Sequence, residues 1–148
     1  ALTGHLVFST LHTLNAKMTI ERITAYFRPE EREAVRMELA LALKGVLSQR
    51  LLKKADGKGR VPCLEIMIGT ELVSKLLREN KLEELQQVLK NRDAGMQTYD
   101  QSIVDLYKQK LITLEEALQN ATDEQFVKRA MEGRYAEGDR FGLVGGFS

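Results

Sequence analysis

A short apolar stretch, HLVFSTLH at residues 5–12, lies near the start of the chain. Residues 6–11 are apolar or β-compatible at nearly every position, and the run is too short for a helical signal. Such a run is typical of a strand buried in a sheet. We therefore predict a buried strand over residues 6–11. Because it follows Ala1 with almost no lead-in, we expect the chain to be a piece of a longer protein, although loss of an initiator methionine or of a tag would also explain Ala1.

Downstream of this strand, helical spacing of apolar residues dominates the sequence. The strongest stripe extends from Val35 to Leu51 in steps of three and four residues, which predicts one long helix. Capping-box patterns open two later helices, at Thr98–Gln101 and at Thr113–Glu116. The remaining predicted helices cover residues 20–27, 72–77, 82–89, 103–111 and 114–121, with one more opened by Thr122 and Gln125.

A second strand is predicted over residues 61–68, after the charged turn KKADGKGR at 53–60. Two strands do not make a stable sheet by themselves. Either a third strand lies in a segment with misleading helical spacing, or sequence outside this chain completes the sheet. From Gly133 onward the sequence is glycine-rich without a period, which favours a flexible tail over 133–148.

Composition excludes several function classes. The 22 Lys and Arg residues balance 21 Asp and Glu residues, so no bulk positive charge suggests a nucleic-acid partner. The lone Cys63 cannot form an internal disulfide, and no cysteine–histidine pattern indicates zinc. No apolar run has the length of a transmembrane segment, and we expect a cytoplasmic protein.

The two histidines flank the predicted strand. Because a strand rises about 3.3 Å per residue, His5 and His12 would lie roughly 20 Å apart, too far to share a metal ion. His12 follows the strand's carboxyl end, among Thr10 and Thr13, at the edge where α/β sheets bind ligands. A neutral imidazole there can donate a hydrogen bond to a phosphate. A polar residue that merely ends a strand would give the same pattern, and the chain has no G-x-x-x-x-G-K-[ST] phosphate loop of its own.

Several motifs in the same order resemble one family. The segment TGHLVFSTLHT at 3–13 closely resembles the His box of the secretion ATPase superfamily, the hexameric motors of type IV pili and type II secretion. The similarity continues to about residue 121, through SQRLL at 48–52, GRV and LEIMI within 59–68, GMQTYDQ at 95–101 and LITLEEAL at 111–118.

Within the superfamily, the chain is most similar to the pilus retraction motors of twitching motility. It lacks the four-cysteine zinc insert that many assembly and secretion members carry after the long helix. Retraction motors carry a helix written A-I-R-N-L-I-R-E, which is required for retraction, but Ser74 and Lys75 depart from that pattern. A plain amphipathic helix is the alternative interpretation. The matching positions are Leu72, Val73, Leu76, Leu77, Arg78 and Glu79.

The resemblance implies a helix-rich α/β fold. Residues 1–70 would be the C-terminal part of a RecA-like ATPase core, and residues 71–132 a helical C-terminal subdomain. His12 and His5 would be the catalytic residues, with His12 sensing the γ-phosphate of ATP. Thr10 and Thr13 would contact the nucleotide, and no residue is expected to bind a metal directly.

The resemblance also implies partners and cofactors. The intact protein would be a homo-hexamer that uses ATP and Mg²⁺. It would act at the cytoplasmic side of the inner membrane, on the pilus platform protein. The family's phosphate loop and Mg-binding acidic box precede the His box, so this chain alone should neither bind nor hydrolyse ATP. The alternative is a non-enzymatic helical interaction module, whose basic turn would bind a partner through Arg50, Lys53, Lys54, Lys58 and Arg60.

Overall fold

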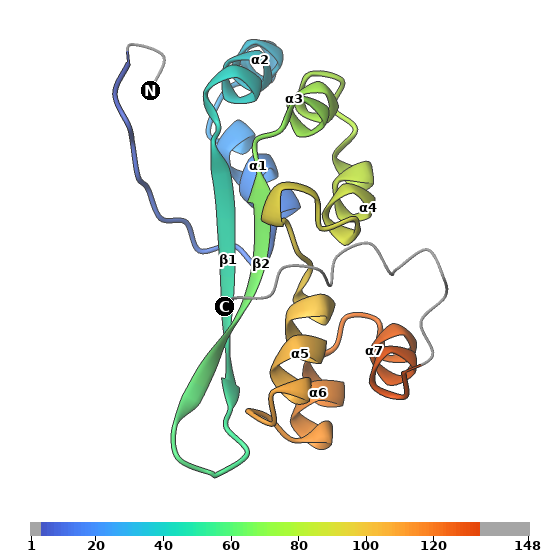
Figure 1. The fold of residues 1–148 in the computed structure, drawn as a ribbon. Helices are drawn as coiled ribbons and strands as arrows, with labels where there is room; N and C mark the ends of the chain where they lie inside the picture. The colour runs from blue at the N-terminus through green and yellow to red at the C-terminus, as the bar shows by residue number, and fades with distance from the viewer. Residues whose placement is uncertain (1–3, 134–148) are drawn as a thin grey trace.

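The computed structural model describes residues 4–133; the predicted tail beyond Gly133 lies outside them. A two-stranded antiparallel hairpin forms the spine, with helices packed along it (Figure 1). The elements in chain order are α1 (Ala16–Ala25), α2 (Arg32–Ala42), β1 (Gly45–Lys53), β2 (Arg60–Ile68), α3 (Glu71–Arg78), α4 (Leu85–Lys90), α5 (Tyr99–Lys108), α6 (Leu114–Asn120) and α7 (Glu124–Met131). Short 3₁₀ turns cover Pro29–Glu31, Leu82–Glu84 and Asp93–Gly95.

The buried strand predicted over residues 6–11 is wrong for this structure. The segment has no strand assignment, and Leu6 and Phe8 are 74% and 88% exposed. A strand needs a hydrogen-bonded neighbour, and none of the described residues supplies one to this segment. In Figure 1 it leaves α1 as an extended trace that no helix covers.

The long helix predicted over residues 35–51 is wrong in its second half. α2 ends at Ala42, Leu43 is extended, and Gly45 begins β1, which pairs in register with β2 from Gly45↔Ile68 to Lys53↔Arg60. The alternative that a strand lies in a segment with misleading helical spacing is therefore confirmed for β1. Because residues 6–11 form no strand, β1 and β2 make a two-stranded sheet. The strand over 61–68 and the helices over 20–27, 72–77, 82–89, 103–111 and 114–121 are confirmed with shifted ends.

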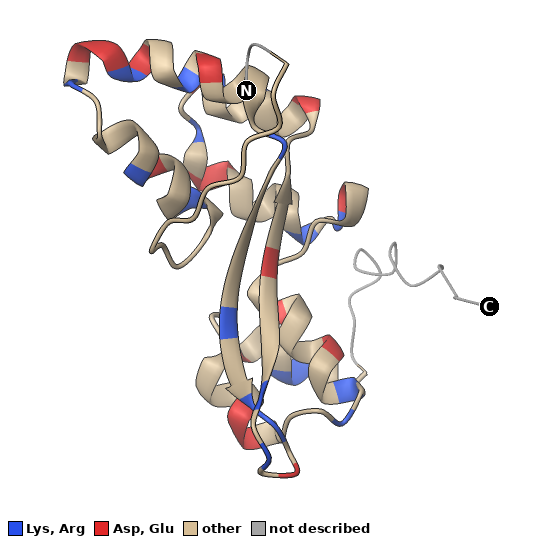
Figure 2. Cartoon of the chain, turned by 90° about the vertical axis from the view of Figure 1, so that its left-hand side faces the viewer, with Lys and Arg blue, Asp and Glu red and all other residues tan. Residues whose placement is uncertain are grey.

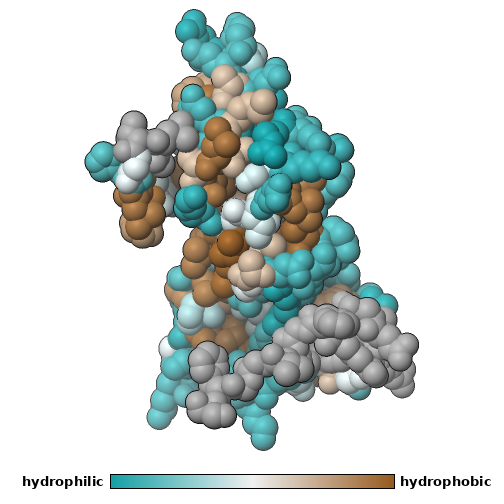
Figure 3. Space-filling model, turned by 45° about the horizontal axis from the view of Figure 1, so that its top comes forward, coloured by the Kyte–Doolittle hydropathy of each residue, from teal (hydrophilic) through white to brown (hydrophobic). Residues whose placement is uncertain are grey.

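Two apolar clusters hold the molecule together. The first cluster contains residues of α1, α2, α3 and α4, together with Met67 of β2 and Met96. Ile20, Leu77 and Leu89 are among its most buried members. The second joins α5, α6 and α7 to Leu52 and Cys63 of the hairpin. One face of the hairpin carries both clusters, while Leu47 and Leu51 on the other face are exposed. Figure 3 shows hydrophobic side chains, coloured brown, at the surface. The hairpin tip is rich in charged residues (Figure 2). None of the described helices is long and apolar enough to cross a bilayer.

Candidate functional site

The predicted phosphate-facing residues lie on the extended segment before α1. His5, Thr10 and His12 are all exposed there. The His12 side chain makes no hydrogen bond or ion pair with any other residue in the range 4–133. Its imidazole is therefore available to an external acceptor such as a phosphate oxygen.

Thr13 differs from Thr10 because its hydroxyl is already engaged. Its Oγ1 lies 2.7 Å from Oγ1 of Thr19, which in turn donates to the carbonyl oxygen of Asn15 at 2.9 Å. A hydroxyl has one proton to donate, so Thr13 must be the donor to Thr19. In this arrangement Thr13 has no proton left for a phosphate, and its predicted role in nucleotide binding stays a prediction that requires this pair to open.

Two side chains hold the first turn of α1 in place. The side chain of Asn15 accepts the amide N–H of Met18 at 2.8 Å, as an N-cap does. Glu65, which is only 2% exposed, accepts the amide N–H of Ala16 at 2.8 Å through Oε1. Its Oε2 accepts from Nε2 of Gln86 at 3.0 Å. This buried carboxylate therefore satisfies an otherwise unpaired N-terminal amide of α1 and joins α1, β2 and α4.

Tyr99 fixes the residue that precedes this cap. Its phenol donates to the carbonyl oxygen of Leu14 at 2.9 Å. Burial raises the pKa of the Tyr99 phenol, so the group keeps the proton that it donates. The guanidinium of Arg50 lies 4.0 Å from the centre of the Tyr99 ring, in a cation–π contact.

The GMQTYDQ segment is a structural junction. Gln97 forms an antiparallel bridge with Ile66 through two backbone hydrogen bonds of 2.9 and 3.0 Å, and Thr98 caps α5 in the predicted capping box with Gln101. Met96 is buried in the first cluster. In the sequence, Met96 and Gln97 stand out only because the segment resembles that of the family. In the structure, their contacts connect β2 to α5 and to the first cluster.

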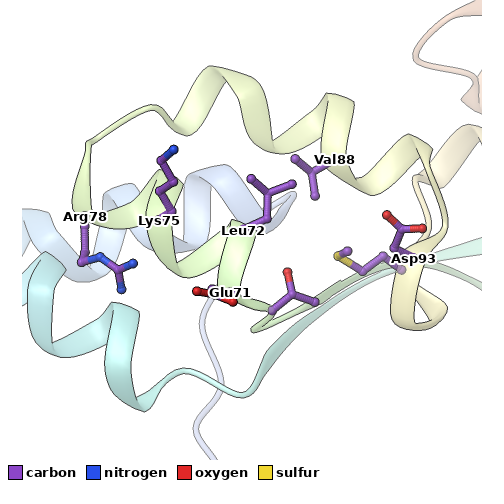
Figure 4. A pocket seen from close by; sticks show the side chains of 8 residues that line it. Glu71, Leu72, Lys75, Arg78, Val88 and Asp93 are labelled. Atoms are coloured by element: carbon purple, nitrogen blue, oxygen red, sulfur yellow. The ribbon is translucent and has the colours of Figure 1, made fainter.

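The helix that resembles the retraction motif is α3, whose prediction as a helix is confirmed. Val73, Leu76 and Leu77 are buried in the first cluster, whereas Leu72, Arg78 and Glu79 are exposed. The carboxylate of Glu79 accepts a hydrogen bond from the ammonium of Lys81 at 2.8 Å, and this bond lowers the pKa of Glu79. A shallow groove runs beside α3, with Leu72 and Lys75 on one side and Val88 and Asp93 on the other (Figure 4).

The described residues provide only part of a nucleotide site. His12 offers one hydrogen-bond donor, but no group of three or more His, Cys, Asp or Glu residues within 4–133 could hold a metal ion. The sequence has no phosphate loop. The part of the chain that the structure describes therefore does not supply a complete site for ATP with Mg²⁺.

The helix-rich α/β fold is that of the C-terminal portion of a secretion ATPase. The chain belongs to the family described as "Type II/IV secretion system protein", whose profile matches residues 1–134. This shows the superfamily and the fold class that the sequence motifs implied.

Several similar proteins carry names that refer to twitching motility or type IV pili. The chain is 47% identical over 126 residues to a "Twitching motility protein" of Neisseria gonorrhoeae, covering 84% of this chain and 34% of that protein. It is 43% identical to the "Type IV pilus retractation ATPase PilT" of Pseudomonas aeruginosa, covering 82% and 35%. Among solved structures, the crystal structure of "the Pilus Retraction Motor PilT and Bound ADP" matches with a TM-score of 0.75 and 44% identity, covering 86% of this chain and 35% of that one. The chain thus spans about a third of the length of the relatives that it matches.

Proposed function

We propose that this chain forms part of an ATP-driven motor that retracts type IV pili, and that its His12 senses the terminal phosphate of ATP. The observation that carries the proposal is the 44% identity and common fold with a retraction motor whose structure contains ADP. The exposed, unpartnered imidazole among the described residues supports the role of His12.

His12 would act through a difference between nucleotide states. A hydrogen bond to the γ-phosphate exists with ATP and is lost with ADP, and only such a differential contact can shift a conformational equilibrium. His5 and Thr10, on the same segment, would support this contact. Residues 1–70 would move with the nucleotide while residues 71–132 pack on them, so that hydrolysis rotates one subunit against the next.

The assembly follows from the same proposal. Six copies would form the motor in the cytoplasm, with Mg²⁺ held by groups outside this chain. Among the positions that match the retraction motif, Leu72, Arg78 and Glu79 are exposed. They would contact a neighbour or the pilus platform protein at the inner membrane.

The test uses the protein expressed from its complete coding sequence. His12→Ala should lower ATP turnover by about tenfold or more, since a hydrogen bond to a charged group contributes roughly 1.5–3 kcal/mol. Hexamers measured by light scattering should persist. Gln87→Ala, which truncates an exposed side chain of α4, should leave turnover unchanged. Normal turnover in His12→Ala would contradict the proposed role of His12, and absence of hydrolysis in the unaltered protein would favour a non-enzymatic interaction module.

A further inference from the structure

Tyr99 connects two parts of the chain that are 85 residues apart in sequence. It is the first residue of α5 and is only 3% exposed. Its phenol reaches the carbonyl oxygen of Leu14, two residues beyond His12. Among the hydrogen bonds between described residues, it is the first long-range one that follows His12 along the chain.

The other side of Tyr99 faces the C-terminal helices. Arg50 packs its guanidinium on the Tyr99 ring and also donates from Nη1 to the carbonyl oxygen of Asn120 at 3.5 Å, at the end of α6. The next residue, Asp100, accepts the amide N–H groups of Thr122 and Asp123 before α7. Tyr99 thus lies between the His12 segment and the α6–α7 junction.

The segment that carries His12 has two long-range anchors at its carboxyl end. Tyr99 holds Leu14, and Glu65 holds Ala16. The Glu65 bond belongs to the capping of α1 and acts on a helix that Asn15 also caps. The Tyr99 bond lies outside the helix, so it acts on the direction in which the chain leaves α1 toward His12.

We propose that Tyr99 is a positioning residue for His12, which fixes the His12 segment through Leu14 and couples it to the α6–α7 unit. This inference rests on the proposed function of His12. Positioning matters because small displacements of a catalytic contact cost large factors in rate. Tyr99 touches neither nucleotide nor reacting atoms in this account.

A double-mutant cycle on the hydrolysing protein tests the inference. Tyr99→Phe removes one oxygen and keeps the ring under Arg50. We expect kcat for ATP to fall roughly fivefold, the equivalent of one hydrogen bond of about 1 kcal/mol, with little change in KM. In a His12→Ala background, Tyr99→Phe should have no further effect, because both changes act through the same imidazole. The matched control is Tyr107→Phe, on the same helix but without a recorded partner for its hydroxyl, which should keep kcat.

The outcomes separate the two proposals. If His12→Ala is fully active, the proposed function of His12 fails. If His12→Ala is impaired but Tyr99→Phe is normal, or if the two losses multiply, the positioning role fails while the function of His12 stands.

A measurement on the 148-residue chain tests whether Tyr99 holds the segment even if the Tyr99→Phe protein fails to assemble into hexamers. In Tyr99→Phe, the heteronuclear NOE of the Asn15 amide, which shares a peptide group with the freed Leu14 carbonyl, should fall, while that of Ile103 in the middle of α5 stays unchanged. An equal heteronuclear NOE at Asn15 in both chains would show that Tyr99 does not hold the segment and would overturn the inference.

Discussion

The carboxylate of Asp100 accepts the amide N–H of Thr122 at 2.7 Å, and this bond joins the first turn of α5 to the start of α7. Its second oxygen accepts the amide of Asp123 at 2.9 Å, the residue that caps α7 by accepting from Phe126. Asp100 is itself buried. One side chain therefore satisfies two backbone donors and sets the position of the last described helix.

Replacing Asp100 by Ala should destabilise the chain strongly. Two donors would lose their partner, and each bond to a charged acceptor contributes roughly 1.5–3 kcal/mol, so we expect a loss of about 2–4 kcal/mol in the free energy of unfolding after partial rehydration. Urea denaturation followed by circular dichroism measures this.

The control for Asp100→Ala removes another carboxylate from the same helix. Asp105 pairs with Arg92 at 2.8 Å, with both side chains about a third exposed. Such partly exposed pairs contribute about 1 kcal/mol or less. If Asp105→Ala proved as costly as Asp100→Ala, the bidentate bonding at the start of α7 would not be the source of the effect.

The helices and β2 could be predicted from sequence because local patterns indicate them. β1 could not, because its formation depends on long-range pairing. Thr98 and Gln101 formed the capping box that their spacing predicts. The apolar residues of 46–52 fit a helical stripe equally well, but pairing with β2 across a turn with left-handed Gly57 and Gly59 selected the strand. For α7, the cap is Asp123 and not the predicted Thr122.

The supporting residues of the candidate site were missed for a similar reason. The alternation within residues 61–68 puts Glu65 and Met67 on one face of the strand, but it does not indicate that this face is the covered one. An acidic residue between Cys63 and Met67 at alternate positions was the available signal of a buried carboxylate. The bond between Tyr99 and Leu14 has no local signal, because only the fold brings residues so distant in sequence together.

Gly69→Ala should destabilise the junction between β2 and α3. A Cβ atom at Gly69 would lie 2.1 Å from the carbonyl oxygen of Leu43, a backbone atom that cannot rotate away. The amide of Gly69 donates to the carbonyl oxygen of Lys44 at 2.9 Å, which holds the two segments in contact. We expect a loss of about 3 kcal/mol or more in the free energy of unfolding.

Gly57→Ala is the control for this contact. Gly57 has a φ of +70° at the hairpin turn, and no atom lies within 4 Å of an added Cβ. Its substitution should cost only the left-handed backbone penalty of about 1–2 kcal/mol. Thermal or urea denaturation of both variants tests this, and a Gly69→Ala chain as stable as Gly57→Ala would mean that the junction can open without loss.

The Cys63 thiol should be unreactive in the folded chain. It should also make the free energy of unfolding fall at alkaline pH. Burial raises the pKa of its thiol, and its Sγ lies 3.7 Å from the carbonyl oxygen of Tyr99. Since the thiolate is the nucleophile, iodoacetamide at neutral pH should alkylate the folded chain about a hundredfold more slowly than the urea-unfolded chain.

The folded thiol keeps its proton where the unfolded one loses it, so this contribution to stability is complete below about pH 8.5 and declines as pH rises through the folded pKa. Cys63→Ala should therefore flatten the fall in the free energy of unfolding above about pH 8.5. An unchanged slope, or rapid alkylation of the native chain, would mean that the thiol is accessible.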